Sequence, residues 1–184
     1  KLLRETMAQP HHIARRNNTG FTLLELLVAL ALMGMLAAWG LPNFQALGER
    51  SAVTSEVNRL QTILTLARNT AITQQSDITV CPANEGKNAC SDDWNNPVII
   101  VQGDKTTSIS DQDIVRVFAP TKGVHVTKNG RSRIKYDSIG YTRGYNSTYT
   151  ICPGNDQTAT SGATLVLSNL GRASTGEAPT SCAD

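Results

Sequence analysis

The strongest constraint in this sequence is a long apolar run near its N-terminus. Within residues 21–47 the only charged side chain is that of Glu25. A membrane-spanning helix needs about 20 consecutive apolar residues, so this run is long enough to cross a bilayer. Arg15 and Arg16 precede it, and positively charged flanks stay on the cytoplasmic side. We therefore predict a single transmembrane helix over residues 21–47, with the N-terminal residues before it on the cytoplasmic side and the part of the chain after it outside.

Two features inside this run suggest that it does more than anchor the chain. A carboxylate costs about 3 kcal/mol at the centre of a membrane, so Glu25 is expected to have a partner and a role. Gly40 and Pro42 lie in the second half of the run. Proline has no N–H donor and clashes with the preceding helical turn. We expect a helix kink at Gly40 and Pro42.

Two alternatives concern the N-terminus itself. Ala37 and Ala38 imitate an ordinary signal-peptide cleavage site, and cleavage there would remove most of the apolar helix. The chain begins with Lys1, and Met7 is a candidate initiator that would leave a shorter basic leader. In that case residues 1–6 are an upstream artefact, and otherwise they belong to a longer leader.

Beyond the apolar run, residues 48–75 are predicted to continue as an amphipathic helix. Apolar side chains recur there at helical spacing. Polar side chains fall on the other faces, namely Glu56, Arg59, Arg68 and Asn69. Such a helix packs one stripe against a partner layer. The residues of the stripe are Val53, Val57, Leu60, Leu64, Ala67 and Ala71.

From residue 76 to the end, the pattern changes to β-structure. Short runs rich in Val, Ile, Thr and Tyr alternate with turn residues, which predicts an antiparallel sheet or two. Asn129-Gly130 lies between two such runs and predicts a β-hairpin. Residues 156–162 and 174–180 are polar and are expected to be exposed loops. The predicted strands are residues 77–81, 98–101, 114–118, 124–127, 133–136, 148–152 and 164–167.

The four cysteines are Cys81, Cys90, Cys152 and Cys182. No close Cys-x-x-Cys pair and no histidine cluster accompanies them, so we predict no metal site. In an exported chain an even number of cysteines favours two disulfides, which places this region in an oxidising compartment. Nearest-neighbour pairing joins Cys81 to Cys90 and Cys152 to Cys182, but the sequence permits three connectivities.

The charge balance does not favour a polyanion-binding protein. Of the 17 basic residues four precede Gly20, and of the 15 acidic residues one does. The part from Phe21 onward therefore carries 13 basic and 14 acidic residues and is close to neutral. A globally basic surface for nucleic acid is not implied. His125 has no recognisable nucleophile partner in a motif context, so we predict neither an enzyme nor a cofactor.

The start of the apolar run carries a resemblance to a known family. It reads Gly20-Phe21-Thr22-Leu23-Leu24-Glu25, which resembles the prepilin peptidase motif of type IV pilins and type II secretion pseudopilins. The resemblance implies that residues 1–20 are a leader, that prepilin peptidase cuts between Gly20 and Phe21, and that Phe21 is then N-methylated. It also implies that Glu25 sets the subunit register by pairing with the terminal amine of a neighbouring subunit, and it puts Pro42 at the family's kink.

A second resemblance lies near the C-terminus. Residues 165–172, with Cys152 before and Cys182 after them, look like the end of the GspH/FimT family of minor pilins and pseudopilins. This implies an α+β pilin fold, in which a long N-terminal helix packs on a β-rich head over residues 76–184. It further implies inner-membrane storage with the head in the periplasm, other pilins or pseudopilins as partners, and incorporation into a filament.

Three functions follow from these resemblances. The first is a minor type IV pilin in pilus assembly or initiation near the tip, and the second is a minor pseudopilin of type II secretion. The third is a DNA-binding minor pilin. Some relatives bind DNA through Gly-Arg-x-Arg, of which this chain keeps Gly171 and Arg172 but lacks the second arginine. A local basic run of Lys128, Arg131, Arg133 and Lys135 could contact phosphates. The tyrosines that follow it could stack on bases if they are exposed, namely Tyr136, Tyr141, Tyr145 and Tyr149. The sequence nevertheless does not favour nucleic acid as a partner.

Overall fold

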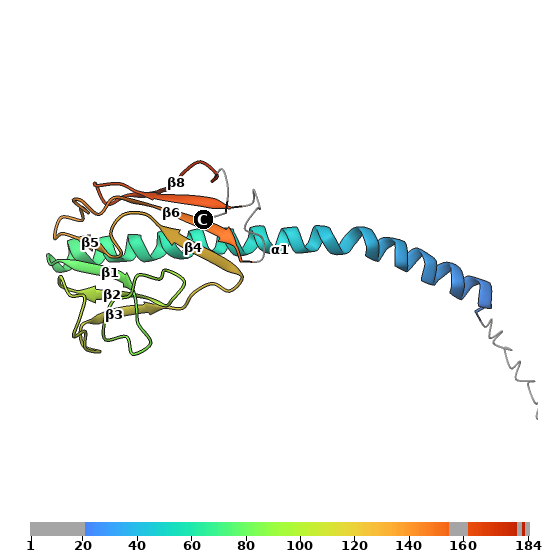
Figure 1. The fold of residues 1–184 in the computed structure, drawn as a ribbon, viewed down its shortest axis with the longest axis horizontal. Coiled ribbons are helices and arrows are strands. Elements are labelled where there is room, and N and C mark those ends of the chain that lie inside the picture. Colours follow the sequence, from blue (N-terminus) through green and yellow to red (C-terminus); the bar gives the residue numbers. More distant parts are fainter. Residues whose placement is uncertain (1–20, 155–161, 180–181, 183–184) are drawn as a thin grey trace, which may run out of the picture. The chain divides into compact units, whose positions relative to one another are not determined.

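One helix leads into two sheets in the computed structural model, which describes residues 21–154, 162–179 and 182, with the backbone alone at residues 39–46. Helix α1 is Leu23–Gln74 (Figure 1). The chain divides into two compact units, Lys1–Pro42 and Asn43–Asp184, and α1 contributes to both. No helix among the described residues is both long enough and apolar enough to cross a membrane. The backbone is helical at Gly40 and Pro42, and a kink there stays a prediction.

The C-terminal end of α1 is fixed by local hydrogen bonds. Gln75 follows the helix in a left-handed conformation with φ of 49°. Its amide donates to the carbonyl of Ile72, and the amide of Ser76 donates to the carbonyl of Ala71. This pair of bonds is a Schellman motif, which satisfies carbonyls that the helix itself leaves unpaired. The helix therefore ends where the chain must turn into the first strand.

Eight strands form two antiparallel sheets of four (Figure 1). The first sheet has the order β3-β2-β1-β5 and the second the order β4-β6-β7-β8. This α+β arrangement confirms the predicted fold class, and seven of the strands overlap predicted ones. Their bounds are β1 Ile78–Pro82, β2 Val98–Gln102, β3 Ile114–Phe118, β4 Val124–Lys128, β5 Ile134–Tyr136, β6 Ser147–Pro153, β7 Ala163–Leu167 and β8 Ala173–Thr175.

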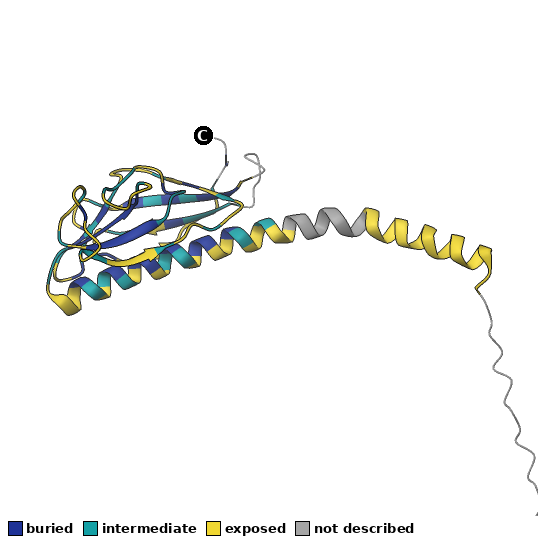
Figure 2. Cartoon of the chain, turned by 90° about the horizontal axis from the view of Figure 1, so that it is seen from below, coloured by how far each residue is buried: buried dark blue, intermediate teal, exposed yellow. Residues whose placement is uncertain are grey.

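The core lies between the C-terminal part of α1 and the two sheets. All six residues of the predicted apolar stripe are buried, and Ile63 joins them. Figure 2 shows their burial on one side of the helix. They pack in one cluster with Val80 and Ile100 of the first sheet and Tyr149 and Leu165 of the second. The helix stripe therefore joins two sheets that share no strand.

Glu56 lies off the predicted apolar stripe and is nevertheless buried. Its side chain is only 1% exposed, and that of Arg59 is 12% exposed. Two hydrogen bonds of 2.8 and 2.6 Å join the Arg59 guanidinium to the Glu56 carboxylate. A buried carboxylate needs such a partner, because desolvation of an unpaired charge is costly. Periodicity alone did not reveal that the head covers this face as well.

The opposite face of the first sheet has a small core of its own. Ile99 and Val101 of β2 point away from α1 and pack with Cys81, Ala83 and Ile109. Loops between β1 and β3 cover this face. The disulfide between Cys81 and Cys90 lies within this cover. The second disulfide joins Cys152 to Cys182, so the structure forms both bonds of the nearest-neighbour pairing.

The prediction that Asn129-Gly130 forms a β-hairpin is wrong, because the strands before and after it do not pair with each other. The strand before it, β4, pairs with β6, and the strand after it, β5, pairs with β1 in the other sheet. Gly130 does turn the chain, with φ of 76°. The Asn129 side chain accepts a hydrogen bond of 2.7 Å from the amide of Thr148 in β6. The turn signal was therefore correct locally, but the chain uses it to cross between sheets.

The C-terminal segment also differs from expectation. Residues 173–175 form β8, which pairs with β7 through Leu165–Thr175 and Leu167–Ala173 neighbours. The prediction of a loop from residue 174 is therefore wrong at its start. A run of small polar residues carries no alternation, and pairing with an existing strand edge supplies the order. The loop predicted at residues 156–162 lies outside the described residues except for Gly162.

Candidate functional site

The start of α1 presents the predicted assembly residues. Phe21 is 86% exposed. The amide of Glu25 donates to the Thr22 hydroxyl over 3.2 Å, so Thr22 caps the helix. Threonine at the cap and glutamate three residues later is the sequence pattern of a capping box. Our sequence reasoning treated Glu25 as a charge in an apolar helix and missed this local signal. Gly20 lies outside the described residues.

The helix beyond the cap carries apolar side chains on all its faces, and these are exposed in the described part of the chain. Side chains pointing in every direction are more than half exposed. A helix of this kind is normally buried, in a membrane or against other helices. The described part of the head does not provide that cover. The exposed residues are Leu23, Leu24, Leu26, Leu27, Val28, Leu30, Leu32, Met33, Met35 and Leu36.

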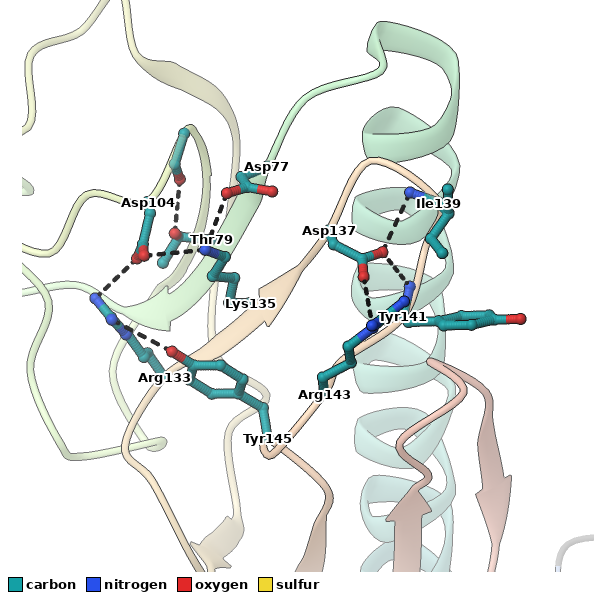
Figure 3. A network of polar contacts seen from close by, with 11 residues as sticks. Asp77, Thr79, Asp104, Arg133, Lys135, Asp137, Ile139, Tyr141, Arg143 and Tyr145 are labelled. Atoms are coloured by element: carbon teal, nitrogen blue, oxygen red, sulfur yellow. Dashed lines mark hydrogen bonds and ion pairs between the residues drawn. The ribbon is translucent and has the colours of Figure 1, made fainter.

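The predicted basic run is largely neutralised in the folded head (Figure 3). Arg133 forms an ion pair of 3.1 Å with Asp104 and a hydrogen bond of 3.3 Å with the Tyr145 hydroxyl. Lys135 lies 2.9 Å from Asp77 and 3.1 Å from Asp104. Hydrogen bonds to these carboxylates raise the pKa of Lys135 above its ordinary value, and Asp77 has the larger effect. Two of the four cations of this run therefore already have acidic partners.

The remaining members of the run divide between core and surface. Lys128 is half-buried, and its ammonium lies 5.8 Å from the ring centres of both Trp94 and Tyr149. It also donates to the carbonyls of Asn129 and Arg131. Arg131 is exposed, with its guanidinium 4.8 Å from the centre of the Tyr145 ring. Only Arg131 of this run therefore presents an exposed charge with no ion pair among the described residues.

Most of the tyrosines are not free to stack on bases. Tyr136 and Tyr149 are fully buried in the core. Burial raises the pKa of both phenols above the ordinary value. Tyr141 and Tyr145 are half-buried. The ring of Tyr141 faces Arg143, and the ring of Tyr145 faces both Arg131 and Arg133. A stacking platform for single-stranded nucleic acid requires exposed rings, which this surface does not offer.

A loop after β5 joins this network to the turn before β8. The Asp137 carboxylate accepts hydrogen bonds from the amides of Ile139 and Tyr141 and pairs with Arg143 over 3.2 Å (Figure 3). Farther along, the Thr142 hydroxyl donates to the carbonyl of Ser168 over 2.7 Å. The turn that carries Gly171 and Arg172 is thereby held by a loop about thirty residues earlier in the sequence.

Arg172 lies apart from the basic run in its contacts. It is exposed and lines a cavity of about 200 Å³ together with Arg68 of α1. Leu64, Thr65 and Gly171 complete part of the wall. The structure thus brings together Arg133 and Lys135 around Asp104, but it places Arg172 with a helix residue that the sequence did not single out.

No catalytic or metal-binding arrangement was found in the described part of the chain. Within those residues, no group of three or more His, Cys, Asp or Glu side chains could hold a metal ion.

Two family models match the sequence over the regions just described. A model described as type II transport protein GspH matches residues 56–171. That range covers more than half of the chain and includes the amphipathic part of α1 and most of the sheets. The chain belongs to the GspH family. A second model, the prokaryotic N-terminal methylation motif, matches residues 15–41 of this GspH-family chain.

Solved structures are similar to this GspH-family protein. One is the type IV minor pilin FimU of Pseudomonas aeruginosa, with a TM-score of 0.58 and 21% identity over 73% of this chain and 97% of that one. Another is the minor pseudopilin EpsH of Vibrio cholerae, with a TM-score of 0.47 and 13% identity over 70% of this chain and 98% of that one. No curated protein sequence matches the chain.

Together these findings confirm the predicted family and pilin fold. The GspH family comprises structural pilin and pseudopilin subunits, so the chain is a pilin-like subunit. The cleavage site, the methylation of Phe21 and the register role of Glu25 stay predictions. Sequence reasoning missed the Thr22 cap, the acidic partners of Arg133 and the presence of Arg68 and Arg172 at the same cavity. Only the first of these had a local sequence signal.

Proposed function

We propose that this chain is a minor pilin that acts in the assembly or initiation of a type IV pilus, close to the filament tip. The observation that carries the proposal is the N-terminal methylation motif at residues 15–41, followed by a helix whose large apolar side chains are exposed from Phe21 to Leu36. Such a surface requires cover by lipid before assembly and by neighbouring helices afterwards. Its work is mechanical rather than catalytic.

Processing comes first in this proposal. Prepilin peptidase removes residues 1–20 by cutting between Gly20 and Phe21, and Phe21 becomes the N-methylated terminus. Residues 21–47 then hold the subunit in the inner membrane with the head in the periplasm. Mass spectrometry of the native protein should find N-methylated Phe21 as its first residue. A freely soluble periplasmic protein beginning after Ala38 would overturn the proposal.

Assembly depends on Glu25 in this proposal. The new terminal amine of one subunit pairs with the Glu25 carboxylate of a neighbour and selects the axial register, because a charge pair is strong in a low dielectric. Gly40 and Pro42 allow the helix to bend where subunits pack. The head then presents its surface to other subunits at the tip.

The capping geometry supplies a control for the Glu25 experiment. Glu25→Ala removes both the charge and the side chain of the capping box, whereas Glu25→Gln keeps a capping side chain and removes only the charge. Both variants should insert into the membrane and be processed, and both should be lost from sheared filaments on immunoblots. Wild-type incorporation of Glu25→Gln would show that capping, and not charge pairing, is the role of this residue.

A second candidate is a minor pseudopilin of a type II secretion system. The observation that favours it is the family model over residues 56–171, which is described as a type II transport protein. Deletion of the gene in its own host separates the two. Loss of surface pili with normal secretion supports the pilin, and loss of secretion with normal pili supports the pseudopilin. The neighbouring genes should agree with the phenotype.

The third candidate, DNA uptake, receives less support from the head. Arg133 and Lys135 have acidic partners, and a polyanion needs several unpaired cations along its track. We expect no gel shift of DNA at low salt. A salt-dependent shift that disappears when Arg131, Arg133 and Arg172 are changed together to Ala would reverse this conclusion.

A further inference from the structure

The cavity between α1 and the turn before β8 contains an unusual concentration of positive charge. Arg68 approaches it from the helix and Arg172 from the turn. Neither arginine takes part in an ion pair among the described residues. Two guanidinium groups that line one cavity of about 200 Å³ repel each other unless an anion lies between them.

Hydrogen-bond donors at this place also lack acceptors. The Nε–H of Arg68 is buried and has no hydrogen-bond acceptor among the described residues. The Tyr136 hydroxyl, which belongs to the core and not to the lining of the cavity, has none there either. The charge of Arg68 is close enough to this phenol to oppose the rise in its pKa. Buried polar groups are nearly always satisfied, so unsatisfied ones need an explanation. An unsatisfied N–H on one of two arginines that line the same cavity favours an oxyanion as the ligand of this cavity.

Exposed apolar side chains surround the arginines. Gly140 packs against α1, because a methyl group placed on it would lie 2.8 Å from Ile72 Cδ1 and 3.0 Å from Arg68 Cγ. Gly171 packs in turn against the Gly140 carbonyl. Leu64 in the cavity wall is buried, but three large apolar side chains at or next to these contacts are exposed. They are Ile72 at 45%, Ile139 at 54% and Leu170 at 47%.

This combination fits a protein better than a nucleic acid. Protein interfaces combine arginine with apolar side chains, whereas a nucleic acid strand needs a row of cations for its phosphates. The nearby Arg133 and Lys135 cannot extend such a row because Asp77 and Asp104 neutralise them. The surface therefore suits one isolated anion with apolar flanks.

We propose that Arg68 and Arg172 bind a carboxylate presented by a neighbouring protein subunit, whose apolar residues cover Ile72, Ile139 and Leu170. Arginine is suited to this task because its planar fork donates two parallel hydrogen bonds to a carboxylate. That the neighbour is a filament subunit rests on the proposed function. The carboxylate site itself depends only on the head.

The test uses the full chain in detergent micelles and follows the arginine Nε–H resonances by NMR. The probe is the tripeptide Leu-Asp-Leu with blocked ends, and its matched control is Leu-Asn-Leu. We expect Leu-Asp-Leu to move the Arg68 and Arg172 signals saturably and Leu-Asn-Leu to leave them unchanged. Arg172→Gln should abolish the response of Arg68. Arg116→Gln removes an exposed arginine of β3, which belongs neither to this cavity nor to the loop that holds its turn, and should preserve the response.

Each other outcome contradicts the proposal. No saturable shift, or equal shifts with both tripeptides, would show that the cavity does not select a carboxylate. Saturation by inorganic phosphate at lower concentration than by Leu-Asp-Leu would assign the site to phosphate. Arg68→Gln is a weaker test because Arg68 packs against Gly140, so Arg172→Gln decides. These results do not depend on filament formation, whereas the Glu25 experiment does not depend on this cavity.

Discussion

At Gly171 a single added methyl group should strongly disturb the turn that carries Arg172. Its φ is 75°, a left-handed conformation. A Cβ on Gly171 would collide with the carbonyl oxygen of Gly140 and lie 3.1 Å from Tyr136 Cε1. The obstructing atom is backbone, which cannot rotate away as a flexible side chain can. Gly171→Ala must therefore push apart the turn and the loop that hold Arg172.

The magnitude follows from two separable costs. A left-handed conformation costs a residue with a Cβ about 1 kcal/mol more than glycine. Forcing an extra carbon into a closed contact costs about 2 kcal/mol more. Gly144 isolates the first cost, because its φ is 76° and nothing lies within 4 Å of a Cβ placed there. We expect Gly144→Ala to lower the free energy of unfolding by about 1 kcal/mol and Gly171→Ala by about 3 kcal/mol.

Urea unfolding of the disulfide-intact chain, followed by near-ultraviolet circular dichroism, measures both variants. The comparison is made on the free energies obtained by linear extrapolation, with the slopes required to agree. Equal destabilisation by Gly171→Ala and Gly144→Ala would refute the reasoning, because it would mean that the close approach of the turn to the Gly140 carbonyl has no energetic consequence.

Three further predictions concern the covalent and ionisable groups of the head. Cys182→Ala opens a disulfide with a sequence separation of 30, and loop entropy predicts a loss of about 4 kcal/mol in the free energy of unfolding. Cys90→Ala opens the disulfide with a separation of 9, for which the predicted loss is about 3 kcal/mol. Urea unfolding under oxidising conditions measures both. Burial lowers the pKa of Lys128 to about 8. Between that value and the ordinary 10.5 the unfolded chain binds the extra proton, so the free energy of unfolding should rise with pH there, and Lys128→Met should abolish the rise. Hydrogen bonds from Lys105 and Ser110 lower the pKa of Asp113 to about 2. The stabilisation of the fold by ionised Asp113 should therefore be fully present above the ordinary pKa of 3.8 and disappear as the pH falls towards 2. In Asp113→Asn this part of the pH dependence of the free energy of unfolding should be absent.

Much of the local structure was predictable because its causes are local. The helix stripe from Val53 to Ala71 follows from spacing alone, and burial of one face was its direct consequence. Seven strands were recognisable from their composition. The β8 strand was not, because Ala173–Thr175 has no alternation of its own and is ordered by the edge of β7. The Asn129-Gly130 turn was recognised, but its sequence does not encode which sheet the next strand joins.

The interaction surface was less predictable, because its charges are set by distant partners. Arg133 and Lys135 look like a basic patch in the sequence, yet Asp104 and Asp77 reach them from other loops. Arg68 had no visible role until the fold placed it beside Arg172. A sequence pattern reports residues up to a few positions apart, whereas a surface is made of residues that the topology brings together.

The amino-acid sequence by itself determined the N-terminal features of this protein: basic residues before the apolar run, an N-terminal methylation motif over residues 15–41 and an apolar helix with one carboxylate. These need only the properties of neighbouring residues and the period of a helix. The tertiary structure decided the pairing of strands into two sheets, the disulfide connectivity, the neutralisation of the basic run and the cavity with two arginines. Each of these depends on contacts between segments far apart in the chain, which form only when burial of the common core brings them together.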